Sequence, residues 1–401
     1  MFDLLLKNAK TVFPDGIRIA DICISGGKIS KIGVNLNMKA KEVFDCGGFY
    51  VLPGIIDAHT HMRTPGLTHK EDFKTGSSAC AAGGITTFLD MPNTVPATIS
   101  VKALNDKRRF ASQDSIVNYG FYIAAIGSNF DEIKHAENIA GVKIYFGAHY
   151  KDISVENKKT LEELFKWGKT RIVVHAENEK GPREAVKQVL HLAKKYDAEV
   201  HIAHISSRGE IEEIKKFKNE KITCETAPHY LFLDENSMKT NPPIRSRDDQ
   251  NALWQAIDDG VIEIIATDHA PHTKDEKSTL SAPPGVPGVE TSLPLMLDAV
   301  NKMRIDLIDV VKLMSENPAR IFGIENKGKI AEGFDADLVI VDMNARRRVE
   351  NQKLFTKCGW SPFNNWELTG WPKMTIVNGV KVFEDGKIIA GDFRGKEVRF
   401  L

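Results

Sequence analysis

Short apolar runs rich in β-branched residues alternate with charged, amphipathic stretches through the middle of this chain, and no other feature constrains its fold as strongly. Such runs are typical of parallel strands covered on both faces, and the stretches between them are typical of helices. We predict strands at 51–56, 86–89, 116–124, 142–146, 172–174, 200–203, 222–224 and 261–266. We predict helices at 101–111, 130–139, 160–169, 182–196, 210–218 and 249–258. The spacing of Thr68 and Glu71 is that of a capping box and predicts the start of the first helix.

Eight such strands in succession predict an α/β fold, a (β/α)8 TIM-like barrel, which we assign to residues 51–331. A barrel of this type takes about 250 residues. The chain has 401 residues, so we expect a second unit.

The two ends of the chain show a different pattern, with short strands and tight turns. Gly26 and Gly27 separate two short apolar segments, and Asn378 and Gly379 separate two more. Asn-Gly favours a type I′ turn, because both residues tolerate positive φ. We therefore expect residues 1–50 and 332–401 to form hairpins and to pair into one small β-sandwich.

Composition excludes several classes of partner. The 54 Lys and Arg balance 54 Asp and Glu, so neither a basic surface for nucleic acid nor an acidic tail is expected. The N-terminus has no charged leader, and no apolar run is long enough to cross a membrane. The five cysteines are scattered without a Cys-x-x-Cys pair, which predicts reduced core residues. We expect a soluble, cytoplasmic protein with a small-molecule substrate.

A His-x-His motif directly follows the first predicted strand. Side chains two positions apart on a strand point the same way, so His59 and His61 can bind one metal ion. The motif alone is weak support, because a chain of this length can carry one by chance. Polar residues at or near the ends of other predicted strands strengthen it, namely Asn93, Lys143, His175, His204 and Asp268. In a parallel barrel these ends meet on one rim, where the chemistry occurs.

Some histidines have ordinary alternative explanations. His175 alone could be a hydrogen-bonded core residue, but its place at a strand end favours a ligand. His201 and His204 lie three apart on a predicted strand, so we expect them to face opposite sides and only one to enter the site. The remaining candidates fall on or near predicted helices and are expected at the surface, namely His69, His135 and His191.

Asp268 and Lys143 are the two charged residues whose burial needs an explanation. Asp268 follows an apolar run, so its carboxylate needs a compensating cation, and beside a metal it could act as general base. Lys143 lies within a predicted buried strand, where an ammonium is costly and would repel a metal. A neutral Lys143 amine could instead react with carbon dioxide, and the carbamate would bridge two metals. The alternative is an ion pair with a nearby acid.

Several segments together resemble the amidohydrolase superfamily, and within it most closely the dihydroorotases of the long form with a composite β-sandwich. The resemblance covers most of the chain and rests on the segments 53–63, 66–73, 90–94, 241–245, 268–272 and 282–290. The chain departs from many members at Thr64, where they carry glutamate.

The resemblance implies two zinc ions bridged by carboxylated Lys143 and hydroxide. One would be held by His59, His61, Lys143 and Asp268, and the other by Lys143, His175 and His204. It implies that the substrate carboxylate is bound by Arg63, Asn93 and His272, and the planar guanidinium of Arg63 suits this task. It further implies contacts from Asn241, Pro284 and Gly285 to the pyrimidine ring.

The implied activity is that of a cyclic amide hydrolase, the reversible conversion of N-carbamoyl-L-aspartate to L-dihydroorotate and water in pyrimidine synthesis, with Asp268 as the catalytic base. The resemblance leaves open a homodimer or an association with other pyrimidine-pathway enzymes. One alternative is a hydantoinase, dihydropyrimidinase or allantoinase, which needs no site for an α-carboxylate. A second is a scaffold without metal, but such proteins tend to lose ligands, and none is missing here.

Overall fold

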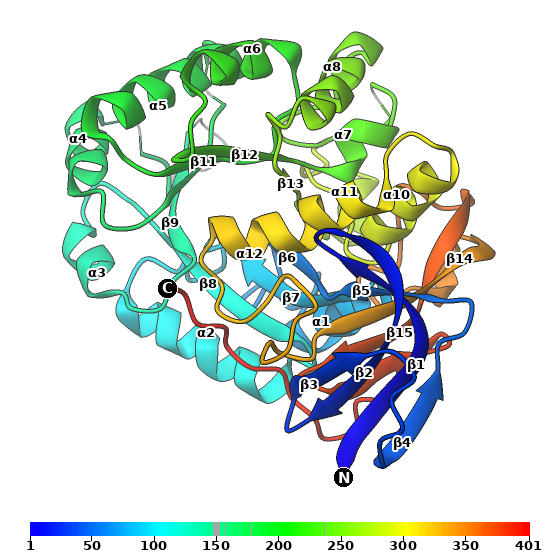
Figure 1. Ribbon diagram of the computed structural model, residues 1–401. Coiled ribbons are helices and arrows are strands. Elements are labelled where there is room, and N and C mark those ends of the chain that lie inside the picture. The colour runs from blue at the N-terminus through cyan, green and yellow to red at the C-terminus, as the bar shows by residue number, and fades with distance from the viewer. Residues whose placement is uncertain (147–152, 156, 178, 236) are drawn as a thin grey trace.

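Two sheets organise the chain in the computed structural model, which describes residues 1–146, 153–155, 157–177, 179–235 and 237–401 (Figure 1). Within these ranges, one sheet has eight parallel strands in sequence order. They are β6 (Ile55–Thr60), β7 (Ile85–Asp90), β8 (Asn118–Ala124), β9 (Gly141–Tyr145), β10 (Ile172–His175), β11 (Val200–Ile202), β12 (Ile222–Thr226) and β13 (Ile264–Ile265). The first and last strands approach through an isolated bridge between Thr60 and His269, so the sheet is a nearly closed barrel. The predicted barrel is confirmed.

Helices surround the barrel and follow most of its strands (Figure 1). They are α1 (Phe73–Ala82), α2 (Val101–Asp114), α3 (Phe130–His135), α4 (Lys158–Trp167), α5 (Pro182–Tyr196), α6 (Arg208–Phe217), α7 (Pro228–Phe232), α8 (Arg247–Asp258), α9 (Lys274–Lys277), α10 (Ser292–Asn301), α11 (Leu307–Val311) and α12 (Asn317–Ile321). A π-helical segment, Lys312–Glu316, joins α11 to α12, and a short 3₁₀ helix spans Asn351–Lys353. In α5, Val186, Val189 and Leu190 are buried at helical spacing, so one apolar face packs on the barrel.

The predicted start of the first helix at Thr68 is wrong. Helix α1 begins at Phe73, and the side chain of Asp72 caps it by accepting a hydrogen bond from the Thr75 amide at 2.8 Å. Glu71 is fully buried and accepts hydrogen bonds from Thr356 and Lys357, so it is not available to complete a capping box at Thr68. The local structure at the start of α1 therefore depends on a contact between Glu71 and Lys357, which are 286 residues apart in sequence.

The predicted strand 51–56 is divided into two strands at Gly54. Residues Tyr50–Pro53 form β5 in the second sheet, whereas Ile55–Thr60 form β6 in the barrel. A Cβ at Gly54 would lie 2.1 Å from the Thr86 hydroxyl, so only glycine lets the chain cross between the sheets here. The barrel strand therefore extends through His59.

The second sheet contains strands from both ends of the chain, as predicted. In the described residues it has nine strands, and β4 pairs with β1 beside the main path. They are β1 (Phe2–Phe13), β2 (Gly16–Ser25), β3 (Lys28–Gly33), β4 (Ala40–Asp45), β5 (Tyr50–Pro53), β14 (Leu338–Arg348), β15 (Glu367–Val377), β16 (Val380–Glu384) and β17 (Lys387–Ile388). Both predicted hairpins are present, and Asn378 and Gly379 have the positive φ angles of 47° and 78° that a type I′ turn requires.

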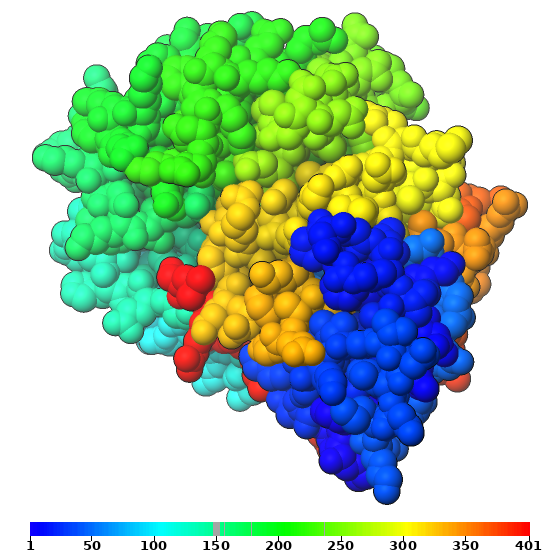
Figure 2. Space-filling model, in the orientation of Figure 1, coloured from blue at the N-terminus to red at the C-terminus, as the bar shows by residue number. Residues whose placement is uncertain are grey.

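This mixed sheet has a hydrophobic core of its own, with buried residues from both ends of the chain. They include Leu4, Leu6, Ile22, Ile24, Val51, Leu338, Ile340, Met374 and Ile376. The N-terminal strands form a lobe that projects from the barrel (Figure 2). Burial of apolar side chains from both termini explains why the two segments fold together.

A separate layer of side chains fills the barrel interior. Tyr122 spans it and donates a hydrogen bond to the Ala58 carbonyl at 2.8 Å. Phe322, which follows α12, packs on Tyr122 with ring centroids 6.0 Å apart. The C-terminal segment returns to the barrel and forms bridges at Tyr119 and Ile324. These contacts close one end of the barrel, so the polar side chains gather at the other.

The five cysteines are buried and unpaired, as predicted. In the part of the chain that the structure describes, no helix is both long and apolar enough to span a membrane.

Candidate metal centre

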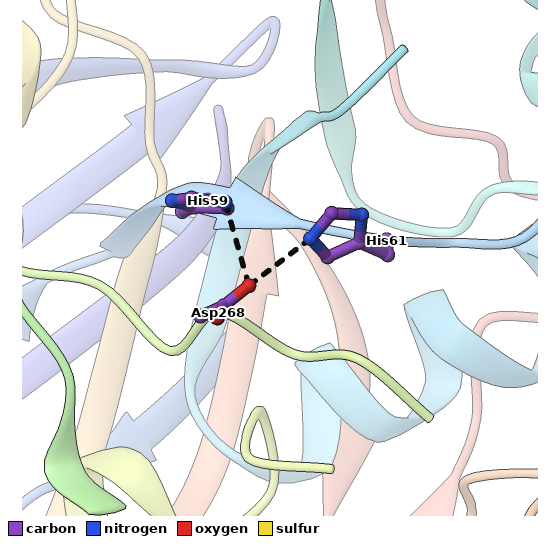
Figure 3. A group of neighbouring side chains, drawn as sticks. All are labelled: His59, His61 and Asp268. Carbon is purple, nitrogen blue, oxygen red and sulfur yellow. Dashed lines mark hydrogen bonds and ion pairs between the residues drawn. The ribbon is translucent and has the colours of Figure 1, made fainter. Parts of the chain in front are cut away.

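His59, His61 and Asp268 converge at the carboxyl end of the barrel (Figure 3). The Asp268 Oδ1 atom lies 3.0 Å from His61 Nε2 and 3.4 Å from His59 Nε2. Among the described residues these three form the one cluster whose possible ligand atoms all lie within 4.8 Å of one another. Two imidazoles and one carboxylate are a typical ligand set for a divalent transition metal.

Hydrogen bonds on the far side of each ring orient His59 and His61. His59 Nδ1 donates to Glu225 Oε1 at 2.5 Å, and His61 Nδ1 donates to Asn93 Oδ1 at 2.6 Å. With the proton on Nδ1, each ring directs the Nε2 lone pair towards Asp268. Burial lowers the pKa of His61 to about 4, so this ring is neutral and able to bind a metal at pH 7.

Glu225 is a site residue that the sequence prediction missed. It lies on β12, is buried, and contacts both His59 and His201, the latter at 3.2 Å. Burial raises the pKa of Glu225, but the two histidines outweigh burial and hold it below its ordinary value. The carboxylate is therefore ionised and fixes the His59 ring. Its position after the seventh predicted strand is the signal that could have identified it, because polar residues at the other strand ends were selected for that reason.

His175 and His204 lie beside this cluster. His175 Nδ1 is 2.7 Å from His204 Nε2, and the His204 ring centroid is 5.3 Å from that of His59. His204 has a φ of 40°, a left-handed conformation that is uncommon outside glycine. Burial lowers the pKa of His204 well below its ordinary value, so it too is neutral.

The expectation that His201 and His204 face opposite sides is wrong. Strand β11 ends at Ile202, so the alternation of side chains does not extend to His204, and its left-handed backbone turns the ring towards the rim. His201 also faces inwards, but deeper, where its ring packs on Phe322 with centroids 5.2 Å apart.

Lys143 lies on β9, opposite Val173 of β10, and is fully buried. Its Nζ has no hydrogen-bond partner among the described residues. Burial lowers the pKa of Lys143 to about 8, and this effect outweighs the opposing charges of Glu225 and Asp268. A buried amine without a partner is costly as an ammonium. Burial therefore favours the neutral amine.

Asp268 is held by contacts around its backbone. Its φ of 47° is left-handed. The neighbouring Thr267 donates its amide and hydroxyl hydrogens to the buried carboxylate of Asp57, at 3.1 and 2.6 Å. Burial raises the pKa of Asp268, but His59 and His61 together hold it well below its ordinary value. Asp268 is thus an ionised carboxylate that faces the Nε2 atoms of His59 and His61.

The donors in this centre fit divalent metal ions. The set contains imidazole nitrogens, a carboxylate and a buried amine. Without bound cations, the buried charges of this set would have no opposite charge to balance them. Nitrogen and oxygen ligands of this kind suit zinc and similar ions.

Arg63 and His272 lie next to the metal cluster and form a second part of the site. Arg63, whose φ is 60°, donates from Nε to the Pro271 carbonyl at 3.1 Å. Its Nη2 lies 3.2 Å from His272 Nε2. Burial and the nearby charges of Arg63 and Lys70 lower the pKa of His272 to about 3. The region combines a permanent cation with a neutral imidazole.

The other four predicted substrate residues lie around the same mouth. Asn241 Nδ2 is 3.3 Å from His175 Nε2. The Pro284 carbonyl lies 3.0 Å from His272 Nε2. Gly285 has a φ of 124°, and a Cβ there would lie 2.7 Å from Ala270 Cβ. A glycine is therefore required for this loop to approach the 268–272 segment. Asn93 accepts from His61 through its oxygen, which leaves its NH₂ group as a donor.

Residues 355–361, from the C-terminal part of the chain, also reach this mouth. The Trp360 indole donates to the His272 carbonyl at 2.7 Å, and the amides of Phe355 and Thr356 donate to Glu290 at 2.9 Å. Nothing in the local sequence identified this segment. Only the tertiary fold brings it beside the barrel.

Comparison with known proteins agrees with this geometry. Residues 50–382 match the amidohydrolase family. The chain is 35% identical to dihydroorotase of Methanothermobacter thermautotrophicus, with 98% of this chain and 97% of that protein covered. It is also 36% identical to a part of the multifunctional protein CAD of Squalus acanthias, which covers 87% of this chain and 16% of CAD.

A solved structure of similar shape is that of L-hydantoinase (dihydropyrimidinase) from Arthrobacter aurescens. It has a TM-score of 0.95, an identity of 30%, and full coverage of both chains. The fold is therefore shared with this L-hydantoinase.

Proposed function

This chain belongs to the amidohydrolase family and, within it, to the dihydroorotases, and from that premise we propose that it interconverts N-carbamoyl-L-aspartate and L-dihydroorotate through a binuclear metal centre. It is a cyclic amide hydrolase of pyrimidine biosynthesis. The observation that carries the metal proposal is the convergence of His59, His61 and Asp268 next to the buried, unpartnered amine of Lys143.

In this proposal His59, His61, Lys143 and Asp268 would hold one metal ion, and Lys143, His175 and His204 would hold a second. Lys143 serves both after its neutral amine adds carbon dioxide, which forms an N–C bond and releases one proton. Its lowered pKa supports this step, because only the unprotonated amine reacts. When bound, such ions polarise a carbonyl and lower the pKa of water from 15.7 to about 7.

Asp268 is proposed as the residue that moves the proton. In the hydrolytic direction, water attacks the ring carbonyl carbon and the ring C–N bond breaks. Asp268 takes the proton from the attacking water and delivers it to the departing nitrogen. Its ionised state supports the role of base, and its Oδ1 atom, 3.0 Å from His61 Nε2, lies at the proposed metal site. Ring closure follows the same steps in reverse.

Arg63, Asn93 and His272 are proposed to bind the substrate carboxylate, and Asn241, Pro284 and Gly285 to contact the ring. A guanidinium and an imidazole 3.2 Å apart offer N–H donors to an anion. They bind and orient the substrate, which places its carbonyl for attack. We also propose that the chemistry belongs to the barrel unit, 51–331, and that the unit formed by 1–50 and 332–401 supports it.

The hydantoinase similarity favours a second candidate function, because L-hydantoinase has nearly the same fold. Hydantoin and dihydrouracil have no α-carboxylate, so an enzyme for them has no use for Arg63 and His272 in these positions. The Arg63 cation beside the neutral His272 ring therefore supports dihydroorotate as the substrate.

Turnover of dihydroorotate, hydantoin and allantoin by the purified protein tests this choice. We expect ring opening of dihydroorotate alone. Activity on hydantoin or allantoin without activity on dihydroorotate would contradict the assignment. Metal analysis of the same sample separates an enzyme from a scaffold, because a scaffold would bind little metal and hydrolyse none of the three.

The substrate is a small molecule, and partners are a further part of the proposal. Similarity to part of a multifunctional protein supports association with other enzymes of the same pathway, or a homodimer. We also infer a cytoplasmic location, because five unpaired buried cysteines suit a reducing compartment.

A further inference from the structure

Lys70 belongs to the segment 66–73 and lies against the substrate-binding part of the site, but the proposed function gives it no role. Its Nζ is 3.1 Å from His272 Nδ1 and 2.9 Å from Glu276 Oε1. Its side chain is only 13% exposed. A largely buried lysine with one contact to a predicted substrate residue suggests a part in substrate recognition.

The contacts of His272 define which of its ring nitrogens carries the proton. A lysine ammonium has donors and no acceptor, so its 3.1 Å contact with Nδ1 is a hydrogen bond if Nδ1 is unprotonated, whereas Nε2 has an acceptor beside it. The neutral ring then carries its proton on Nε2, where the Pro284 carbonyl accepts at 3.0 Å. The Lys70 donor at Nδ1 and the Pro284 acceptor at Nε2 therefore favour the same tautomer, with the proton on Nε2. Arg63 Nη2 lies 3.2 Å from the same Nε2, and two N–H groups cannot bond to each other, so both can donate to a third group.

Glu276 holds Lys70 in this place. It belongs to the short helix α9, which starts two residues after His272, and its carboxylate also accepts from the Thr273 amide at 2.9 Å. Burial raises the pKa of Glu276, but Lys70 and the Thr273 amide outweigh burial and lower it to about 2. The ionised carboxylate thus binds Lys70 and fixes the backbone next to His272. The charged groups that face His272 are Arg63, Lys70, Glu276 and Lys277.

We propose that Lys70 is a positioning residue that fixes His272 as a neutral Nε2–H donor, so that His272 and Arg63 present adjacent N–H groups to the carboxylate of the substrate. This inference rests on the proposed function and deepens it, because it names a residue that distinguishes carboxylated from uncharged rings. With the opposite tautomer, Nε2 would present a lone pair to the carboxylate and repel it.

The test compares Lys70→Met, which removes the charge, with Lys70→Arg, which keeps it. We expect Lys70→Met to raise KM for dihydroorotate by about 10- to 100-fold, the value of a hydrogen bond to a charged group. The kcat value and the metal content should stay near those of the unchanged protein. Lys70→Arg should recover most of the loss.

Two controls accompany this test. Inhibition by dihydrouracil, the same ring without a carboxylate, should be unaffected by Lys70→Met. Lys274→Met, on exposed α9, is the matched control variant.

The nitrogen shifts of His272 in ¹⁵N-labelled protein give a readout besides activity, and we expect the proton on Nε2. The proton on Nδ1, or an unchanged KM in Lys70→Met, would overturn the inference. A parallel fall in kcat and metal content would also overturn it, because it would indicate general damage. In Lys70→Met/Glu276→Gln, recovery of the normal KM would mean that Lys70 only masks Glu276, which contradicts the proposal. If the unchanged protein does not open dihydroorotate, the proposed function itself fails.

Discussion

The metal-binding and the substrate-binding side chains of this site lie on the same barrel rim, but different kinds of structure hold them. His59, Lys143 and His175 are on barrel strands, where the pairing of neighbouring strands sets their positions. Arg63 and His272 are on loops, and contacts from distant residues such as Trp360 fix them. Strand pairing fixes side-chain positions through a regular and rigid pattern of backbone contacts. The loop residues are instead fixed by single contacts that follow no regular pattern.

This difference predicts different consequences of substitution. Changes in the metal-binding part should abolish or strongly reduce the chemical step, because the ions supply most of the lowering of the barrier. Changes in the substrate-binding part should act mainly on KM, because its residues bind and orient the substrate.

Removal of metal should have the largest effect. We expect a chelator to abolish turnover and zinc to restore it. Bound zinc should also raise the free energy of unfolding by about 4 kcal/mol when its concentration is a thousand times Kd. Thermal unfolding with and without zinc measures this, and an equal melting temperature in both conditions would contradict a metal centre in the barrel.

Lys143→Ala should have the second largest effect, a loss of at least about a thousandfold in kcat/KM. The change removes a ligand of both proposed metals and with it several kcal/mol of transition-state stabilisation. A short carboxylic acid or bicarbonate should partly restore activity, because a carboxylate can take the place of the carbamate. Steady-state kinetics with and without acetate measure both effects.

Lys143→Arg is the matched control for that variant. It keeps a positive charge but cannot form a carbamate, and its side chain fills the space that acetate would enter. We expect no activity and no rescue. Full activity in either variant would remove the carbamate from the mechanism.

Glu225→Gln should have an intermediate effect. The change keeps the shape of the side chain but removes the charge that orients His59 through a 2.5 Å hydrogen bond. Loss of such a partner lowers metal affinity or activity by about 10- to 100-fold. Zinc titration of the apoprotein measures it, with Glu235→Gln at an exposed position as control. Unchanged zinc affinity would show that His59 needs no such support.

Trp360→Phe should have the smallest effect and should act on KM. The change removes the indole N–H that donates to the His272 carbonyl at 2.7 Å. One neutral hydrogen bond is worth about 1 kcal/mol, which corresponds to about a fivefold rise in KM. Trp366→Phe, at a more exposed position, is the control. A fall in kcat larger than the rise in KM would mean that the metal-binding and substrate-binding parts of the site are not separable.

Sequence patterns predicted the barrel and the strand-end residues, because both follow from local periodicity. The β-branched runs marked the strands, and parallel strands necessarily bring their ends together. His59, Lys143, His175 and Asp268 could therefore be selected before any contact was known. The Asn378–Gly379 hairpin was predictable for a similar reason, since two adjacent residues define its geometry.

The features that sequence patterns could not predict depend on distant contacts. Helix α1 starts at Phe73 because Glu71 is bound by Thr356 and Lys357, which local spacing cannot reveal. The inward turn of His204 depends on a left-handed backbone after a strand of only three residues. Glu225 directly follows the predicted strand 222–224, so the strand-end argument applies to it as well.

Anomalous diffraction at the zinc edge, from crystals grown with zinc and bicarbonate, tests the central claim most directly. Two zinc peaks are expected at the barrel mouth. One should be bound by His59, His61 and Asp268, the other by His175 and His204, and a carbamate on Lys143 should lie between them. A single peak, or two peaks with an unmodified Lys143 amine directed away from both, would contradict the account.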